Sequence, residues 1–166
     1  LEANPHYLTS GILERICEAM HFAHEKGVLH RDLKPENVML GDFGEVHVMD
    51  WGVARVRSGG ADPETGVGTA GTDAGLETVD GVLQGTVPYM SPEQAAGRAS
   101  DLDRRSDVWA IGCLLYEVLT LHRAFGGEDV LAAVRRGACP SVRTRNPRRP
   151  VPEDLASTSE FLPART

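Results

Sequence analysis

The octapeptide His30-Arg31-Asp32-Leu33-Lys34-Pro35-Glu36-Asn37 constrains the fold and the chemistry of this chain more than any other stretch. It places a carboxylate, an ammonium group and an amide close together, and a further carboxylate, Asp50, follows thirteen residues after Asn37. Phosphoryl transfer needs a base that orients the nucleophile and cations that neutralise the developing charge. The order of these groups therefore indicates phosphoryl transfer, with Asp32 as a general base, a form of assistance typically worth ~100- to 10,000-fold in rate.

The other polar side chains of this region suit the binding of phosphate and metal. Lys34 would place its positive charge near the transferred phosphate. Asn37 and Asp50 offer the hard oxygen ligands that Mg²⁺ prefers, and two such ions would bridge the phosphates of a nucleotide. ATP and Mg²⁺ are therefore the expected cofactors.

Two short apolar runs, residues 38–40 and 46–49, flank a turn-rich link and predict a β-hairpin. This hairpin would return Asn37 and Asp50 to the same side. The link contains Asp42-Phe43-Gly44, which begins only five residues after Asn37, so that the two ends of this short stretch could not face one cleft. We therefore predict that this triplet is the hairpin turn and that Asp50 is the metal-binding carboxylate.

Two further motifs follow in a compatible order. Gly85-Thr86-Val87-Pro88-Tyr89-Met90-Ser91-Pro92-Glu93 is similar to the end of the activation segment of protein kinases, and Asp107-Val108-Trp109-Ala110-Ile111-Gly112 to the start of their central buried helix. Together with the octapeptide, they make the chain resemble the serine/threonine protein kinases common in bacteria, from about Leu8 to about Asp154. The resemblance implies an α+β, mainly α fold: the C-terminal lobe of the family, with a short β-hairpin at the catalytic cleft.

The resemblance also implies one partial kinase domain over residues 1–166. Its parts would be a catalytic loop at 30–37, an activation segment at 50–93 and a central helix at about 106–121. Trp51 stands where the family usually has phenylalanine, and Ser91 where it usually has alanine. Both changes keep the apolar or small character of the position.

The resemblance assigns roles to individual residues. Asp32 is implied to be the catalytic base, assisted by Lys34 and Asn37, and Lys34 marks serine/threonine specificity. The residues implied to bind the nucleotide or its metal are Lys34, Glu36, Asn37, Met39 and Asp50, with Asn37 and Asp50 as the metal ligands. The residues implied in regulation or substrate docking are Arg31, Thr86, Glu93 and Asp107. Arg31 would pair with a phosphate of the activation segment. Asp107 would hydrogen-bond the catalytic-loop backbone, instead of or in addition to acting as a simple helix cap.

The amino-terminal lobe of the family has no counterpart here. The 31 residues before Asp32 contain no glycine-rich phosphate loop and no Val-Ala-Ile-Lys strand. We therefore expect a fragment that is inactive alone, with the missing lobe and a protein bearing Ser or Thr hydroxyls as its partners. The alternative is a truncated pseudokinase or scaffold that binds partners without catalysis. A small-molecule phosphotransferase is disfavoured by Lys34 and by the segment 86–93, which serve peptide docking. The face left open should be partly apolar and promote self-association.

The stretch 57–84 is rich in glycine and poor in apolar residues, so we predict a mobile loop there. Its candidate autophosphorylation sites are Thr65, Thr69, Thr72 and Thr78. An unmodified, solvated spacer is the alternative.

Helical periodicity is clearest at residues 8–26, where Thr9 or Ser10 would cap the helix and Gly27 would end it. The other predicted elements are a helix capped by Ser91, a helix at 106–121 buried on more than one face, a helix at 128–136, and an extended segment from Gly137 to Pro152.

The composition limits the possible functions. The chain has 166 residues and a net charge of −7, which argues against nucleic-acid binding. Its three cysteines are odd in number and widely spaced, which fits a reducing cytoplasm. No apolar run approaches the ~20 residues that span a membrane, although contact with a membrane through other parts of a longer protein stays open. His21 and His24 lie three residues apart, but no third ligand is evident nearby, so no metal site is predicted there.

Overall fold

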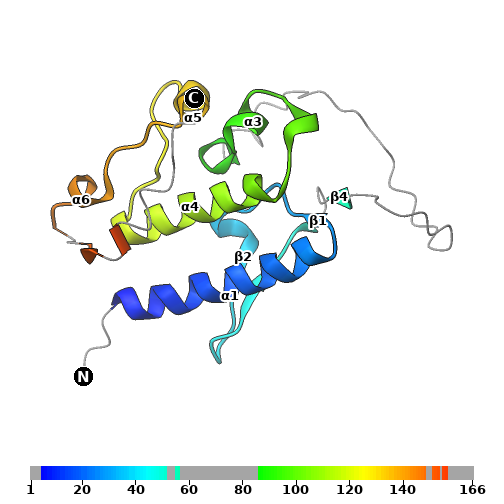
Figure 1. The fold of residues 1–166 in the computed structure, drawn as a ribbon. Coiled ribbons are helices and arrows are strands. Elements are labelled where there is room, and N and C mark those ends of the chain that lie inside the picture. Colours follow the sequence, from blue (N-terminus) through cyan, green and yellow to red (C-terminus); the bar gives the residue numbers. More distant parts are fainter. Residues whose placement is uncertain (1–4, 52–54, 57–85, 149–150, 154, 157–166) are drawn as a thin grey trace, which may run out of the picture.

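The computed structural model describes residues 5–51, 55–56, 86–148, 151–153 and 155–156, and the side chains of all of these except 5–10 and 55–56. The fold is α+β and mainly α, as predicted. Its centre consists of two long helices, α1 (Pro5–Glu25) and α4 (Arg104–Thr120), which lie side by side (Figure 1).

Helix α1 begins earlier than predicted, at Pro5. Proline suits the first helical position because the N–H that it lacks would have no partner there. Thr9 and Ser10 therefore lie inside the helix, and the prediction that one of them caps it was wrong. The predicted apolar face is present: Ile16 and Met20, one turn apart, are buried against the rest of the molecule.

The predicted hairpin is formed by strands β2 (Val38–Leu40) and β3 (Val46–Val48), which pair antiparallel with the first residue of one strand opposite the last residue of the other. Gly41 donates its N–H across the turn over 2.8 Å, and Gly44 has a φ of 85°, a left-handed conformation that glycine adopts without steric cost. Asp42-Phe43-Gly44 is therefore the hairpin turn, as predicted, and its phenylalanine ring is 93% exposed.

A second small sheet pairs β1 (Val28–Leu29) with β4 (Arg55–Val56), also antiparallel. The chain runs from β1 through residues 30–34 into a 3-10 turn, η1 (Pro35–Asn37), and then directly into β2. The octapeptide thus connects the two small sheets, each of which fixes one of its ends.

The next described segment contains three short turns: η3 (Val87–Tyr89), α3 (Pro92–Ala95) and η4 (Ala99–Asp101). Helix α3 begins with a capping box, in which the Ser91 side chain accepts the Gln94 N–H and the Gln94 side chain accepts the Ser91 N–H. Ser91 therefore caps α3, as predicted, and the Gln94 side chain adds the reciprocal hydrogen bond.

Helix α4 begins two residues before the predicted boundary and is capped by Asp103, whose carboxylate accepts the Arg105 N–H. Asp107 lies inside the helix, so the alternative in which it is a simple cap is excluded. The predicted burial on more than one face is confirmed, since Leu114 and Leu119, on different faces, are both buried, but the side chain of Val108 is 57% exposed.

Helix α5 (Val130–Arg136) is capped by Asp129 and ends at Gly137, which has a φ of 66°. The segment predicted to be extended as far as Pro152 contains a further helix, α6 (Val142–Arg145), so that prediction was wrong there. The Ser141 side chain caps α6, and the side chain of Val142 is buried in the core. This burial stabilises one helical turn within a stretch whose prolines favour extended chain.

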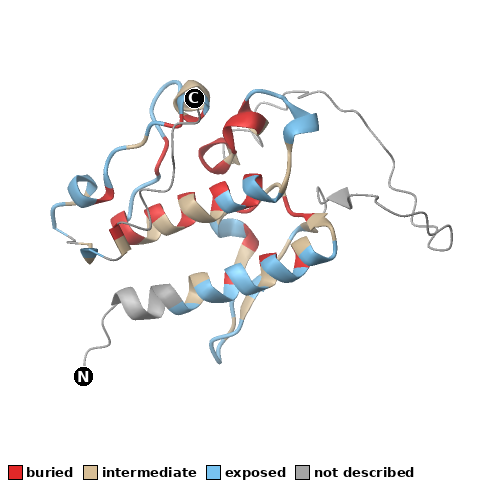
Figure 2. Cartoon of the chain, in the orientation of Figure 1, coloured by how far each residue is buried: buried red, intermediate tan, exposed pale blue. Residues whose placement is uncertain are grey.

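The core lies on two sides of α4 (Figure 2). One side faces α1, and the other faces the segments η3–α3 and α5–α6. Met20, Leu33 and Tyr116 are fully buried there, and the rings of Trp109 and Phe125 stack with centroids 5.6 Å apart. Within the part of the chain that is described, no helix combines the length and the apolarity needed to cross a bilayer.

Candidate active site

A buried carboxylate holds the octapeptide in place. Asp107, on α4, is 1% exposed; its Oδ2 accepts the His30 N–H over 3.0 Å and its Oδ1 accepts the Arg31 N–H over 2.8 Å. His24 Nε2, on α1, lies 2.7 Å from Oδ2 and donates to it, since a carboxylate oxygen can only accept. The hydrogen bonds expected between Asp107 and the loop backbone are therefore present, and α1 adds a third to the same carboxylate.

Arg31 has a strained backbone directly before Asp32. Its φ is 69°, a left-handed conformation that costs a non-glycine residue ~1–2 kcal/mol. Its N–H is bound by Asp107, and its C=O accepts a hydrogen bond from Gln94 Nε2 over 2.6 Å. Both peptide groups of Arg31 are thus held by partners on other elements, which stabilises the turn that precedes Asp32.

Four of the predicted site residues, Asp32 among them, form one hydrogen-bonded cluster. Lys34 Nζ donates to Asp32 Oδ2 over 2.8 Å and to Thr86 Oγ1 over 3.0 Å. Asn37 Nδ2 donates to the Asp32 C=O over 2.7 Å and contacts Asp32 Oδ2 at 3.3 Å. The side chains of Asp32 and Lys34 are only 18% and 17% exposed. Most of their ion pair is therefore shielded from water, and a small part of it remains at the surface.

Asp50 reaches the same region through the hairpin. The Asn37 C=O accepts the N–H of Met49, the residue before Asp50, over 2.8 Å. Asp50 follows directly, with a φ of 60°, and its side chain is exposed. A left-handed aspartate at the end of a strand marks a sharp change of chain direction immediately beside Asn37.

The rings of His30 and Trp51 pack against this turn. His30 is fully buried, with Nε2 at 2.9 Å from the Met49 C=O, and its ring lies 4.6 Å from that of Trp51. Trp51 in turn donates Nε1–H to the Val48 C=O over 3.0 Å. The tryptophan in place of the usual phenylalanine therefore packs on the octapeptide and hydrogen-bonds the hairpin.

The segment after residue 86 is bound to α4 by two acidic side chains. Glu93 is buried and accepts the Ser106 hydroxyl over 2.7 Å. Tyr89 donates its hydroxyl to Glu117 over 2.5 Å, and its burial together with this carboxylate raises the pKa of the Tyr89 phenol well above its usual value. These contacts fix the segment on which Thr86 is carried.

The other predicted residues lie at the edge of this cluster or outside the described chain. Glu36 and Met39 are exposed, Met39 at 50%, on the octapeptide and the first hairpin strand. Thr65, Thr69, Thr72 and Thr78 lie outside the described residues, as do residues 52–54 and 57–85 of the activation segment as a whole, so that the expected pairing of Arg31 with a phosphate there stays a prediction.

Two residues that matter to the geometry were missed. His24 was considered only as a metal ligand, yet it continues the buried spacing of Ile16 and Met20, so a polar residue on an apolar stripe was the available signal. Gln94 completes the Ser-x-x-Gln capping signature, which predicts its contact with Ser91. Nothing local in the sequence indicates its bond to Arg31.

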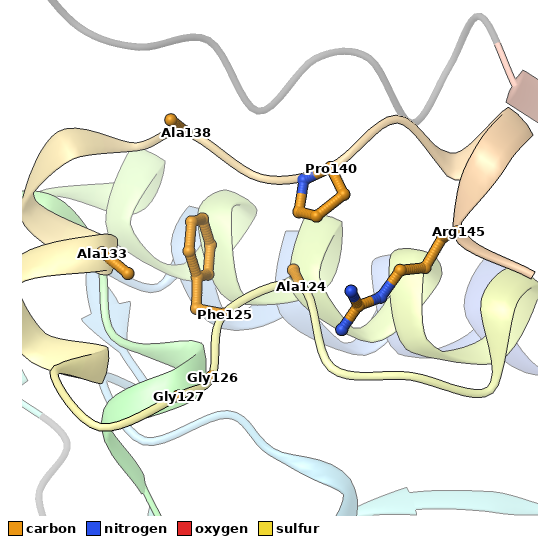
Figure 3. Close-up of a pocket in the computed structure, with 8 residues that line it drawn as sticks. All are labelled: Ala124, Phe125, Gly126, Gly127, Ala133, Ala138, Pro140 and Arg145. Carbon is orange, nitrogen blue, oxygen red and sulfur yellow. The ribbon is translucent and has the colours of Figure 1, made fainter.

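A separate cavity of about 360 Å³ lies between the chain after α4, α5 and the approach to α6. Figure 3 shows Phe125, Pro140 and Arg145 around it. None of the residues that line it belongs to the cluster around Asp32.

Comparison with known proteins places these motifs among related sequences. The family described as the protein kinase domain matches residues 4–161. The chain is 37% identical over 152 residues to serine/threonine-protein kinase PknD of Protochlamydia amoebophila, covering 87% of this chain and 15% of that protein. It is 40% identical over 121 residues to serine/threonine-protein kinase PknB of Mycolicibacterium smegmatis, covering 73% of this chain and 17% of that protein. It thus spans less than a fifth of the length of these curated relatives.

Proposed function

The chain belongs to the protein kinase domain family, with bacterial serine/threonine kinases as relatives, and from this membership we propose that the cluster around Asp32 is a phosphoryl-transfer site. The polypeptide that carries it transfers the γ-phosphate of ATP to Ser or Thr hydroxyls of a protein. The observation that supports this most directly is Lys34, whose ammonium group bridges Asp32 and Thr86.

Asp32 is proposed as the base that accepts the proton of the substrate hydroxyl. Lys34 and Asn37 both address Asp32 Oδ2. Within the described residues, no hydrogen bond to Oδ1 is found, so that this oxygen is available to orient a hydroxyl group. The adjacent ammonium of Lys34 stabilises negative charge that develops on the transferred phosphate.

The donor set fits a magnesium-bound nucleotide. Asn37 uses its Nδ2 on Asp32, which leaves its Oδ1 as a candidate oxygen ligand. Asp50 follows Met49, whose N–H bonds the Asn37 C=O, and would supply the carboxylate. No group of three or more acidic, histidine or cysteine ligands occurs among the described residues. Mg²⁺ commonly uses one or two protein oxygens together with substrate phosphates and water, and this pair matches that pattern. The ion, when bound, supplies charge neutralisation of the phosphates.

Thr86 and the segment that follows it are proposed to bind the protein substrate. The Thr86 hydroxyl accepts from Lys34 over 3.0 Å, so that the start of this segment touches the catalytic pair. A peptide bound along it would present its hydroxyl close to Asp32, and such positioning supplies much of the catalysis of phosphoryl transfer.

Residues 1–166 alone are proposed to transfer phosphate poorly. Met39 offers apolar surface for one side of a nucleotide base, being half exposed on β2. The residues before Asp32 contain no glycine-rich loop or clamping lysine to hold the phosphates. Correct placement of the γ-phosphate therefore depends on a further lobe in the parent polypeptide.

The test uses the polypeptide that contains residues 1–166 together with whatever precedes them in its reading frame. Transfer of labelled γ-phosphate from Mg²⁺-ATP to a Ser/Thr-rich protein is measured for the unmodified protein, for Asp32→Asn and for Asp101→Asn. We expect Asp32→Asn to lower the rate by ~100- to 10,000-fold. Asp101→Asn, the same change at an exposed position of η4, should leave the rate within about twofold, since such surface substitutions rarely matter.

Full activity in Asp32→Asn would remove this residue from the mechanism. An unmodified parent that binds protein partners but transfers no phosphate would instead support the scaffold alternative.

A further inference from the structure

We propose that Gln94 is a positioning residue for the catalytic base, because it ties the end of the substrate-binding segment to the backbone beside Asp32. This inference rests on the function proposed above for the same site. Gln94 is the third residue of α3, and its hydrogen bond to Arg31 spans 63 residues of sequence.

One side-chain amide joins two backbone groups. Gln94 Oε1 accepts the Ser91 N–H over 2.9 Å, and Gln94 Nε2 donates to the Arg31 C=O over 2.6 Å. The orientation of the amide is fixed, because exchanging its oxygen and nitrogen would set donor against donor and acceptor against acceptor. Each end of Gln94 is thus matched to one particular partner.

The Arg31 carbonyl controls the placement of Asp32. It belongs to the planar peptide group whose N–H is that of Asp32, so that fixing the C=O direction also fixes the N–H direction. That N–H contacts His30 Nδ1 at the long distance of 3.3 Å. The short bond from Gln94 is therefore the stronger restraint on this peptide group.

The same two segments are joined at a second point. Thr86 Oγ1 meets Lys34 Nζ at 3.0 Å, near the start of the segment that Gln94 ends. Residues 86–94 are thus attached to the octapeptide at both extremities, once at the ammonium and once at the backbone. A shift of α3 would be transmitted to the peptide group of Asp32 through Gln94.

The experiment compares Gln94→Glu with Arg135→Met in the parent polypeptide. A glutamate retains an acceptor for the Ser91 N–H but cannot donate to the Arg31 C=O. Arg135→Met removes the donor from α5 to the C=O of Ala95, the last residue of α3, while leaving the Gln94 amide and both of its backbone partners. The pair therefore separates the bond to Arg31 from the integrity of the helix. Readouts are kcat and the KM for ATP, and hydrogen exchange at the amide of Asp32.

For Gln94→Glu we expect kcat to fall ~10- to 100-fold, as small misplacements of reacting groups do, with the KM for ATP within about threefold. Exchange at the Asp32 amide should become faster. Arg135→Met should speed exchange in α3 and keep kcat within about threefold of the unmodified protein, since the lost hydrogen bond acts on the stability of that helix.

The proposal is overturned if Gln94→Glu leaves kcat within twofold, or if Arg135→Met lowers kcat as much. Where the unmodified parent transfers no phosphate, the proposed function fails. The exchange measurement still decides on Gln94, since unchanged protection of the Asp32 amide refutes its positioning role.

Discussion

Replacement of Asp107 by asparagine should expose how much of the stability of this chain depends on the anchoring of the octapeptide. The carboxylate accepts from His30 and Arg31 N–H groups and from His24 Nε2, all within 3.0 Å. In asparagine one oxygen becomes an NH₂ group, so that at least one buried backbone or ring donor faces another donor. An unsatisfied buried donor costs ~1–3 kcal/mol, and bonds to a charged acceptor weaken as well. We expect the free energy of unfolding to fall by about 2–4 kcal/mol, taking these two effects together.

Urea unfolding followed by tryptophan fluorescence measures this loss, because Trp51 packs on His30 and Trp109 lies in the core. For a chain of this size the same loss lowers the Tm by ~4–16 °C. Asp103→Asn is the matched control: it makes the same change on the same helix, and asparagine caps a helix as well as aspartate does. Its effect should be much smaller.

The reasoning is refuted if Asp107→Asn unfolds at the same urea concentration as Asp103→Asn. It is also refuted if hydrogen exchange at the amides of His30 and Arg31 is unchanged, because these are the donors that the substitution should release.

Three further predictions concern other parts of the molecule. Burial and a carboxylate partner raise the pKa of Tyr89, and burial raises the pKa of Tyr116 to about 12. The two neutral phenols therefore stabilise the fold fully below pH ~10. This stabilisation is lost as the pH rises through the pKa values of the two phenols in the folded protein. Urea midpoints should fall between pH 9 and pH 11.5, and less steeply in Tyr89→Phe. Asp50→Asn should abolish Mg²⁺-dependent phosphate transfer by the parent, whereas Asp42→Asn, in the exposed hairpin turn, should leave it within about twofold; equal losses would show that the turn binds metal. Residues 1–166 should self-associate in analytical ultracentrifugation through exposed apolar side chains, and Phe43→Ser should reduce this association, since its ring is 93% exposed.

The elements that could be predicted from the sequence are those specified by neighbouring residues. The hairpin follows from two apolar runs around a glycine-rich turn, and Ser91-Pro92 marks a helix start through local hydrogen bonding. The start of α1 was misplaced because Thr9 and Ser10 imitate a cap, whereas Pro5 was already compatible with the first helical turn. Helix α6 was missed because the nearby prolines indicate extended chain, whereas the Ser141 cap and the burial of Val142, a tertiary effect, stabilise this single turn.

The candidate site divides in the same way. Asp32, Lys34 and Asn37 lie within one short stretch, so their proximity is a local property of the chain. The anchors of that stretch come from other elements: His24 from α1, Asp107 from α4 and Gln94 from α3. The family pattern identified Asp107, but neither periodicity nor spacing distinguishes a glutamine that only caps a helix from one that also binds a distant carbonyl.

The separation of these anchors along the chain has a consequence for biosynthesis. The His30 N–H is bonded by Asp107, 77 residues further along the chain, and the Arg31 C=O by Gln94, 63 residues further along. Neither bond can form until these residues have been synthesised. At a translation rate of ~5–20 residues per second, this delay lasts about 3–15 s. Asp32, Lys34 and Asn37 thus leave the ribosome before the residues that anchor their backbone have been synthesised. The octapeptide can take its folded geometry only after α3 and α4 have emerged and packed against it.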